Sequence, residues 1–159
     1  MATEIERKFL IADDGWREHA DAGERYRQGY LFTDRRCSVR LRAAGDRAWL
    51  NVKGTTVGAS RPEFEYEVPL ADALSMLDDL CEPGQIDKTR YRVPAGRHCY
   101  EVDVFHGANE GLVVAEVELD SPDEEFERPS WLGTEVTDDE RYYNARLARR
   151  PWREWPRHE

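Results

Sequence analysis

Residues 3–11, TEIERKFLI, alternate charged and apolar side chains with a period of two. In a β-strand, side chains two positions apart point to the same face of the sheet. Glu4, Glu6 and Lys8 therefore share one face of the strand predicted here, while Ile5 and Phe9 share the other. The stretch predicts a β-strand in which one face carries only charged groups.

The same alternation recurs in seven further stretches, each bounded by turn residues, which is typical of strands. The eight predicted strands cover residues 3–11, 24–33, 36–44, 47–53, 61–69, 87–94, 98–106 and 112–120. The segments between several of them are short, so neighbouring strands are expected to form antiparallel hairpins. The predicted fold class is α+β, mainly antiparallel β.

Helices are expected to be few. One stretch repeats apolar residues at helical spacing, which predicts a helix over residues 70–81 that ends before Pro83 and Gly84. Three further helical stretches are predicted at residues 13–20, near 122–126 and at 138–149. Pro151 and Pro156 argue against a regular helix in the Trp-rich tail.

The chain has 159 residues, a size that fits a single domain over residues 1–159. Its 23 basic and 33 acidic residues give a net charge of −10, which argues against a nucleic-acid partner. No apolar run approaches the roughly 20 residues that a membrane span needs, and the first residues do not resemble a signal peptide. A cytoplasmic protein with no membrane partner is therefore expected, and a homodimer is one option for its oligomeric state.

The charged faces of the predicted strands are nearly pure in sign. The rows are Arg40 with Arg42, Lys88 with Arg90, Glu63 with Glu65, and Glu116 with Glu118. Like charges on one face repel, so such rows need counter-charges nearby. An eight-stranded closed barrel with a charged lumen and helices packed outside would let acidic rows face basic ones. The alternative is a set of hairpins whose charged faces lie in solvent.

A lumen of this composition suits a polyphosphate bound together with a hard metal ion. Carboxylate oxygens suit Mg²⁺ or Mn²⁺, and Arg and Lys bind phosphate oxygens. Competing chemistries find little support, because the chain has neither a GxxxxGK[ST] loop nor an HExxH motif, and no CxxC spacing among its three cysteines. The sequence therefore predicts a metal-assisted phosphate site.

The EIERK motif at Glu4, Glu6 and Lys8, followed by VRLR, RPEFEYEVP, DKTRY, EVDVF and VAEVEL, resembles the CYTH superfamily, the triphosphate tunnel metalloenzymes. An ExExK motif on the first strand is the hallmark of that family. A lone ExExK would be weak, but the ordered set covers nearly the whole chain and is specific. The resemblance implies an eight-stranded antiparallel tunnel that binds a triphosphate.

The resemblance also implies site residues. Catalytic residues would be Glu4, Glu6 and Lys8. The triphosphate would lie along Lys8, Arg40, Arg42, Lys53, Arg61, Lys88 and Arg90. Carboxylates available to Mg²⁺ or Mn²⁺ would be Glu4, Glu6, Glu63, Glu65, Asp103, Glu116 and Glu118. Four residues share the charged faces of these strands but lie nearer strand ends and are left out of the site: Glu67, Arg92, Glu101 and Asp120. No role is assigned to Gln28 and Tyr30, and the helix with Tyr142, Tyr143 and Asn144 is expected to pack against one mouth of the tunnel.

The implied activity is metal-dependent hydrolysis of a small triphosphate, with inorganic tripolyphosphate as the expected substrate and pyrophosphate and phosphate as products. Two other activities of the family stay open at this point, those of class IV adenylate cyclase and thiamine triphosphatase. From a different class, a non-catalytic sensor that binds a triphosphate or polyphosphate would need most of the same charged residues.

Overall fold

A computed structural model describes residues 3–156, so residues 1–2 and 157–159 of the predicted domain lie outside the described part. All eight predicted strands are present within one or two residues of the expected bounds. They are β1 (Thr3–Ile11), β2 (Glu24–Thr33), β3 (Cys37–Ala44), β4 (Arg47–Gly54), β5 (Ser60–Val68), β6 (Ile86–Ala95), β7 (His98–Phe105) and β8 (Val113–Glu118).

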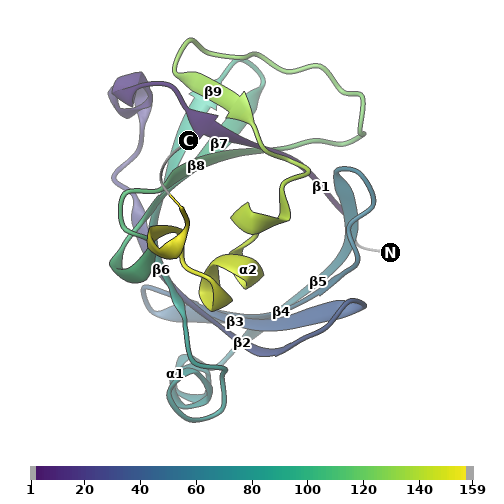
Figure 1. Ribbon diagram of the computed structural model, residues 1–159, viewed down its shortest axis with the longest axis vertical. Helices are drawn as coiled ribbons and strands as arrows, with labels where there is room; N and C mark the ends of the chain where they lie inside the picture. The colour runs from purple at the N-terminus through teal and green to yellow at the C-terminus, as the bar shows by residue number, and fades with distance from the viewer. Residues whose placement is uncertain (1–2, 157–159) are drawn as a thin grey trace.

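The eight strands form a closed antiparallel barrel, as predicted (Figure 1). Their order around the wall is β5-β4-β3-β2-β6-β7-β8-β1, and β1 closes the ring by pairing with β5. The closing seam is short, because β1 meets β5 only from Thr3↔Pro62 to Ile5↔Ser60. On its other side, β1 pairs with β8 from Glu6↔Glu118 to Leu10↔Val114.

A ninth strand, β9 (Leu132–Glu135), was not predicted. It is four residues long and pairs with β1 beyond the β5 seam, where Phe9 faces Glu135 and Ile11 faces Leu132. Its sequence, LGTE, is too short to show alternation, and Gly133 weakens a strand on its own. The pairing to β1 and the ion pair between Arg7 and Glu135 stabilise it instead.

Two of the predicted helical segments form outside the barrel. The helix α1 (Leu70–Asp79) packs on β2, β3 and β4 and buries Ala73 and Leu77 there. The close approach needs Gly29 of β2, since a Cβ there would lie 2.8 Å from a methyl carbon of Leu77. The segment predicted at 13–20 is the 3₁₀ helix η1 (Asp14–His19), which begins where Asp13 accepts a hydrogen bond from the Gly15 amide and which buries Trp16.

The helix predicted near residues 122–126 was wrong. That segment is a turn in which the Glu124 amide donates to the Ser121 carbonyl, and the Glu124 carboxylate accepts from the Asp120 amide and meets His98. A side chain that bonds its own backbone in this way competes with helix formation.

The helix predicted over 138–149 is broken into two pieces. They are the 3₁₀ helix η3 (Glu140–Tyr142) and the helix α2 (Asn144–Arg149), with Tyr143 extended between them. The Lys8 ammonium group donates to the Tyr142 carbonyl, an acceptor that a continuous helix would need for itself. The tail beyond α2 has only the short 3₁₀ helix η4 (Trp152–Glu154), as the prolines predicted, and η2 (Gly107–Asn109) lies between β7 and β8.

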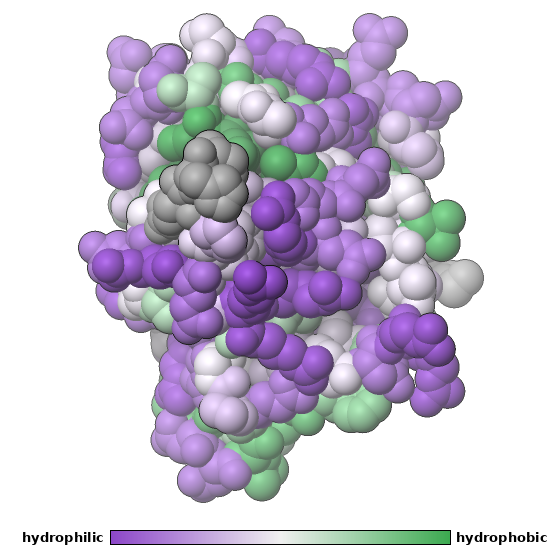
Figure 2. All heavy atoms as spheres, viewed as in Figure 1, coloured by the Kyte–Doolittle hydropathy of each residue, from purple (hydrophilic) through white to green (hydrophobic). Residues whose placement is uncertain are grey.

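Two apolar cores lie outside the strands: one contains Phe9, Trp16, Tyr100 and Trp131, and the other lies under α1. A third fills one end of the barrel interior, where Leu147 of α2 packs on Tyr30, Ile86 and Val114, which lie on the same faces of their strands as lumen residues. The prediction that helices pack outside the barrel is therefore wrong for α2, which enters its end. Figure 1 shows α2 in front of the ring of strands, and Figure 2 shows this face of the molecule filled across its centre by mostly hydrophilic residues. The barrel is therefore covered at this end. No helix in residues 3–156 is long and apolar enough to cross a membrane.

Candidate active site

The barrel encloses a cavity of about 180 Å³ whose lining is almost entirely polar. The strands place their charged rows toward it, since every second residue of a strand faces inward. Its basic lining residues are Arg40, Arg42, Lys53, Arg61, Lys88, Arg90 and Arg92, and its acidic ones are Glu4, Glu6, Glu63, Glu65, Glu101, Glu116 and Glu118. Tyr26, Gln28 and Asn144 complete it. The prediction of a charged lumen is confirmed.

The two signs of charge occupy opposite walls. Most of the cations come from β3, β4 and β6, and the carboxylates come from β7, β8, β1 and β5. Between β3 and β6, β2 contributes the uncharged Tyr26 and Gln28. The cavity is exposed where Glu65, Arg92 and Glu118 lie, and it is covered at the other end, where Asn144 of α2 enters. The site is thus a pocket open at one end, with a cationic wall and an acidic wall.

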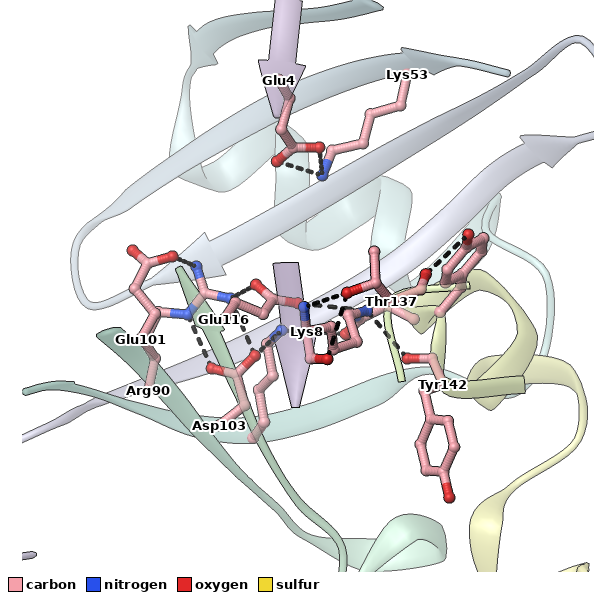
Figure 3. A network of polar contacts seen from close by, with 12 residues as sticks. Glu4, Lys8, Lys53, Arg90, Glu101, Asp103, Glu116, Thr137 and Tyr142 are labelled. Atoms are coloured by element: carbon pink, nitrogen blue, oxygen red, sulfur yellow. Dashed lines mark hydrogen bonds and ion pairs between the residues drawn. The ribbon is translucent and has the colours of Figure 1, made fainter. Parts of the chain in front are cut away.

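The covered end is held by a network of buried ion pairs (Figure 3). Asp103 lies 2.8 Å from the Lys88 ammonium and 2.8 Å from Nε of Arg90, and all three groups are buried. Arg90 continues to Glu116 at 3.3 Å, and Glu116 in turn meets Lys8 at 3.3 Å. Burial lowers the pKa of Lys88 to about 8 despite the attraction of Asp103. This network fixes the positions of the side chains that lie deepest in the tunnel.

Asn144 joins the network from α2. Its side-chain oxygen accepts a hydrogen bond from Lys88 Nζ at 3.0 Å and another from the amide of Gln28 at 3.2 Å. The Lys8 ammonium also lies over the ring of Tyr143, 5.2 Å from its centroid. The segment from Tyr142 to Asn144 therefore closes the tunnel through direct contacts with lumen side chains.

The cationic wall contains guanidinium nitrogens that lack partners. Nε of Arg40 and Nε of Arg42 are buried and donate to no acceptor within residues 3–156. Arg42 donates through its other nitrogen to Glu65 at 2.9 Å, while its pKa is lowered by burial and by the positive charges of Arg40 and Arg90. A buried, unpaired donor is costly and is usually satisfied by a ligand or ordered water. The wall is thus suited to bind an anion.

The acidic wall gathers carboxylates that repel one another. One oxygen each from Glu4, Glu63 and Glu118 lies within 4.8 Å of the others. The pKa of Glu118 is raised by burial and by the negative charges of Glu4, Glu101 and Glu63. Burial, Glu116 and Glu4 together raise the pKa of Glu6 to about 8. A divalent cation bound here would relieve this repulsion, and an all-oxygen donor set suits a hard ion.

Glu4 connects the two walls. Its carboxylate lies 3.2 Å from Lys53 Nζ and 2.9 Å from Nε of Arg61. Burial alone would raise the pKa of Glu4, but Lys53 and Arg61 outweigh it and lower the pKa to about 2. Glu4 therefore stays ionised at neutral pH and is available to a metal ion.

Twelve of the fourteen residues that the sequence nominated line the cavity, and Lys8 and Asp103 do not. The ammonium of Lys8 lies behind Glu116, and Asp103 is enclosed by Lys88 and Arg90. The sequence reasoning set aside Arg92 and Glu101, whose parity on their strands could have included them, and Glu101 lies 3.0 Å from Arg90. It also missed Tyr26. Asn144 was expected only on an element that packs against one mouth of the tunnel, and its contacts with Lys88 and Gln28 in the lumen were not predicted.

Comparison with known proteins agrees with this geometry. The family model of the CYTH domain matches residues 2–148. The chain belongs to the CYTH domain family. An inorganic triphosphatase of Acetivibrio thermocellus is 46% identical over 96% of this chain and 97% of its own length. An inorganic triphosphatase of Nitrosomonas europaea is 40% identical over 92% and 97%.

Solved structures of other proteins share the fold. The crystal structure of an inorganic triphosphatase superposes with a TM-score of 0.65 at 35% identity, covering 93% of this chain and 95% of that one. A putative adenylyl cyclase from Hippeastrum, described as having a dominant triphosphatase activity, superposes with a TM-score of 0.57 over 75% of this chain and 80% of its own, at 12% identity. At that identity the likeness concerns the fold alone.

Proposed function

We propose that this CYTH protein hydrolyses inorganic tripolyphosphate to pyrophosphate and phosphate with Mg²⁺ or Mn²⁺. The observation that carries the proposal is the pair of buried, unpartnered guanidinium nitrogens on Arg40 and Arg42, which face an acidic wall across a cavity open at one end. Its two relatives named inorganic triphosphatase support the same substrate. A small polyanion also suits a cavity of about 180 Å³, whereas a nucleic acid does not.

The chain's own residues bind and orient the anion. Arg40, Arg42 and Arg90 would donate to the non-bridging oxygens and withdraw charge as the P–O bond breaks. Lys53 and Arg61 would contact the end of the anion nearer Glu4, since both cations lie at that carboxylate. Phosphoryl transfer depends mainly on such positioning and charge neutralisation. The cationic wall therefore contributes both binding and stabilisation of the leaving pyrophosphate.

The family implies a divalent metal ion, and the acidic wall fits one. Glu4, Glu63 and Glu118 would hold it, with Glu6 beside them. When bound, such an ion acidifies water and neutralises phosphate charge. Asp103 is satisfied by Lys88 and Arg90, so we assign it the role of holding these cations in place. Glu116 likewise positions Lys8 and Arg90.

The activity is tested by incubating the purified chain with tripolyphosphate, ATP or thiamine triphosphate under Mg²⁺ and Mn²⁺, and measuring phosphate, pyrophosphate and cyclic AMP. We expect phosphate and pyrophosphate in equal amounts from tripolyphosphate, and no turnover with chelator present. Cyclic AMP from ATP would assign the site to the cyclase branch instead. Tight binding of tripolyphosphate without any product would identify a sensor.

Ligand binding should also stabilise the fold. The lumen cations repel one another, so a bound anion removes repulsion only in the native state and shifts the folding equilibrium by linkage. We expect Tm to rise with the concentration of tripolyphosphate and Mg²⁺, and to rise less with inorganic sulfate. An unchanged melting curve at millimolar tripolyphosphate would contradict a binding site in this lumen.

A further inference from the structure

The seam of the barrel leaves a gap beside β1. Backbone pairing of β1 with β5 ends at Ile5, after which the Glu6 amide donates to the Ala59 carbonyl at 3.1 Å. Pairing with β9 starts only at Phe9. Between them the Lys8 amide donates to the hydroxyl of Thr137 at 3.0 Å. The Lys8 carbonyl also accepts from the Val136 amide, just past β9, at 2.8 Å. The gap between the two partners of β1 therefore lies between Glu6 and Lys8.

A small cavity, which we call the side cavity, lies at this gap. It measures about 20 Å³ and is lined by Glu6, Lys8, Ala59, Arg61, Thr137 and Tyr143, together with the loop before Ala59. It shares Glu6 and Arg61 with the tunnel. It shares Ala59 and Thr137 with a broad groove on the outer surface. The side cavity therefore lies between the tunnel and the outside, at the gap in the seam.

The volume of the side cavity limits which molecules it can hold. A site needs roughly 10–15 Å³ of this kind of volume to hold one water molecule. A cavity of about 20 Å³ thus fits one water and is too small for a phosphate group. The side chains around it carry a carboxylate, an ammonium, a guanidinium and three hydroxyls, which offer the two to four partners that an ordered water requires.

We propose that the side cavity supplies the water that attacks the terminal phosphorus of tripolyphosphate, and that Ala59 limits it to one molecule. This inference rests on the proposed function. The water oxygen bonds to phosphorus while the bridging P–O bond breaks, pyrophosphate leaves with the bonding electron pair, and one water proton passes to solvent through the outer groove. Since attack is in line with the leaving group, the reacting phosphate lies at Glu6 and Arg61, which line both cavities, and pyrophosphate lies on the side of that phosphate away from the side cavity.

The first test fills the side cavity without touching a charged residue. We expect Ala59→Leu to lower kcat at least tenfold while the Kd for tripolyphosphate with Ca²⁺, measured by calorimetry, stays within twofold of wild type. Val57→Leu is the matched control, because Val57 is on the same loop, is 78% exposed and does not line the side cavity. Wild-type turnover in a folded Ala59→Leu protein would overturn the proposal.

The second test identifies which molecule attacks phosphorus, and it does not depend on the stability of Ala59→Leu. In aqueous methanol, methanol competes with water, and phosphorus NMR gives the ratio of methyl phosphate to phosphate. We expect Ala59→Gly, which enlarges the side cavity, to raise this ratio severalfold and Ala59→Leu to lower it. The same ratio in wild type and Ala59→Gly would show that the nucleophile comes from elsewhere. A wild-type protein that releases no phosphate would instead refute the proposed function.

Discussion

A Glu63→Gln variant is expected to hydrolyse tripolyphosphate at least roughly a hundredfold more slowly than wild type, the scale of removing one electrostatic contact to a transition state. The amide keeps the shape of the side chain but removes a charge from the cluster with Glu4 and Glu118. Binding of the anion without metal should be unchanged or tighter, because a nearby negative charge is lost. Turnover at saturating substrate and calorimetry without metal measure the two effects.

Glu67→Gln is the control for this experiment. Glu67 lies on the same strand and the same face, but its carboxylate pairs with Arg47 at the exposed end and does not line the cavity. We expect Glu67→Gln to retain turnover close to that of wild type. If Glu63→Gln behaved like Glu67→Gln, Glu63 would have to be removed from the metal site.

Arg40→Met is expected to weaken tripolyphosphate binding while making the free protein more stable. Losing a hydrogen bond to a charged group costs about 1.5–3 kcal/mol, which corresponds to a roughly 10- to 150-fold higher Kd. In the free protein, burial lowers the pKa values of Arg42 and Lys53, and the positive charge of Arg40 lowers them further. Removing Arg40 therefore relieves charge repulsion within the cationic wall. Each kcal/mol gained should raise Tm by about 2–4 °C.

The opposite signs of the two effects make the Arg40 experiment specific. Arg25→Met serves as control, since Arg25 pairs with Asp87 on the exposed outer face of the barrel. That variant should bind tripolyphosphate normally and should not gain stability. A lower Tm for Arg40→Met, or unchanged binding, would mean that Arg40 serves the fold rather than the anion.

The barrel and its charged lumen could be predicted because a single physical rule determines them. A period of two assigns each side chain to one face, and rows such as Arg40 with Arg42 or Glu116 with Glu118 then need opposite charges across a closed sheet. The register of the strands is a separate matter. It places Glu4, Glu63 and Glu118 together and puts Asp103 between Lys88 and Arg90, which depends on pairing that no single strand encodes.

The elements that were missed depend on contacts between distant segments. β9 forms because β1 has a free edge beyond the β5 seam, and its own four residues show no pattern. The helix expected over 138–149 breaks because a lysine 134 residues earlier takes the Tyr142 carbonyl. Asn144 then reaches the lumen as a consequence of that break. Local periodicity cannot detect such long-range competition for backbone groups.

The equal numbers of cations and carboxylates in the tunnel lining affect how a substrate approaches the protein. Because the lining is balanced, the net charge of −10 belongs to the rest of the molecule, and a free polyanion in solution meets a repulsive field before it reaches the mouth. A magnesium complex of tripolyphosphate carries less negative charge and is repelled less. Diffusional encounter therefore favours the metal complex over the bare anion, and added salt should narrow that difference by screening.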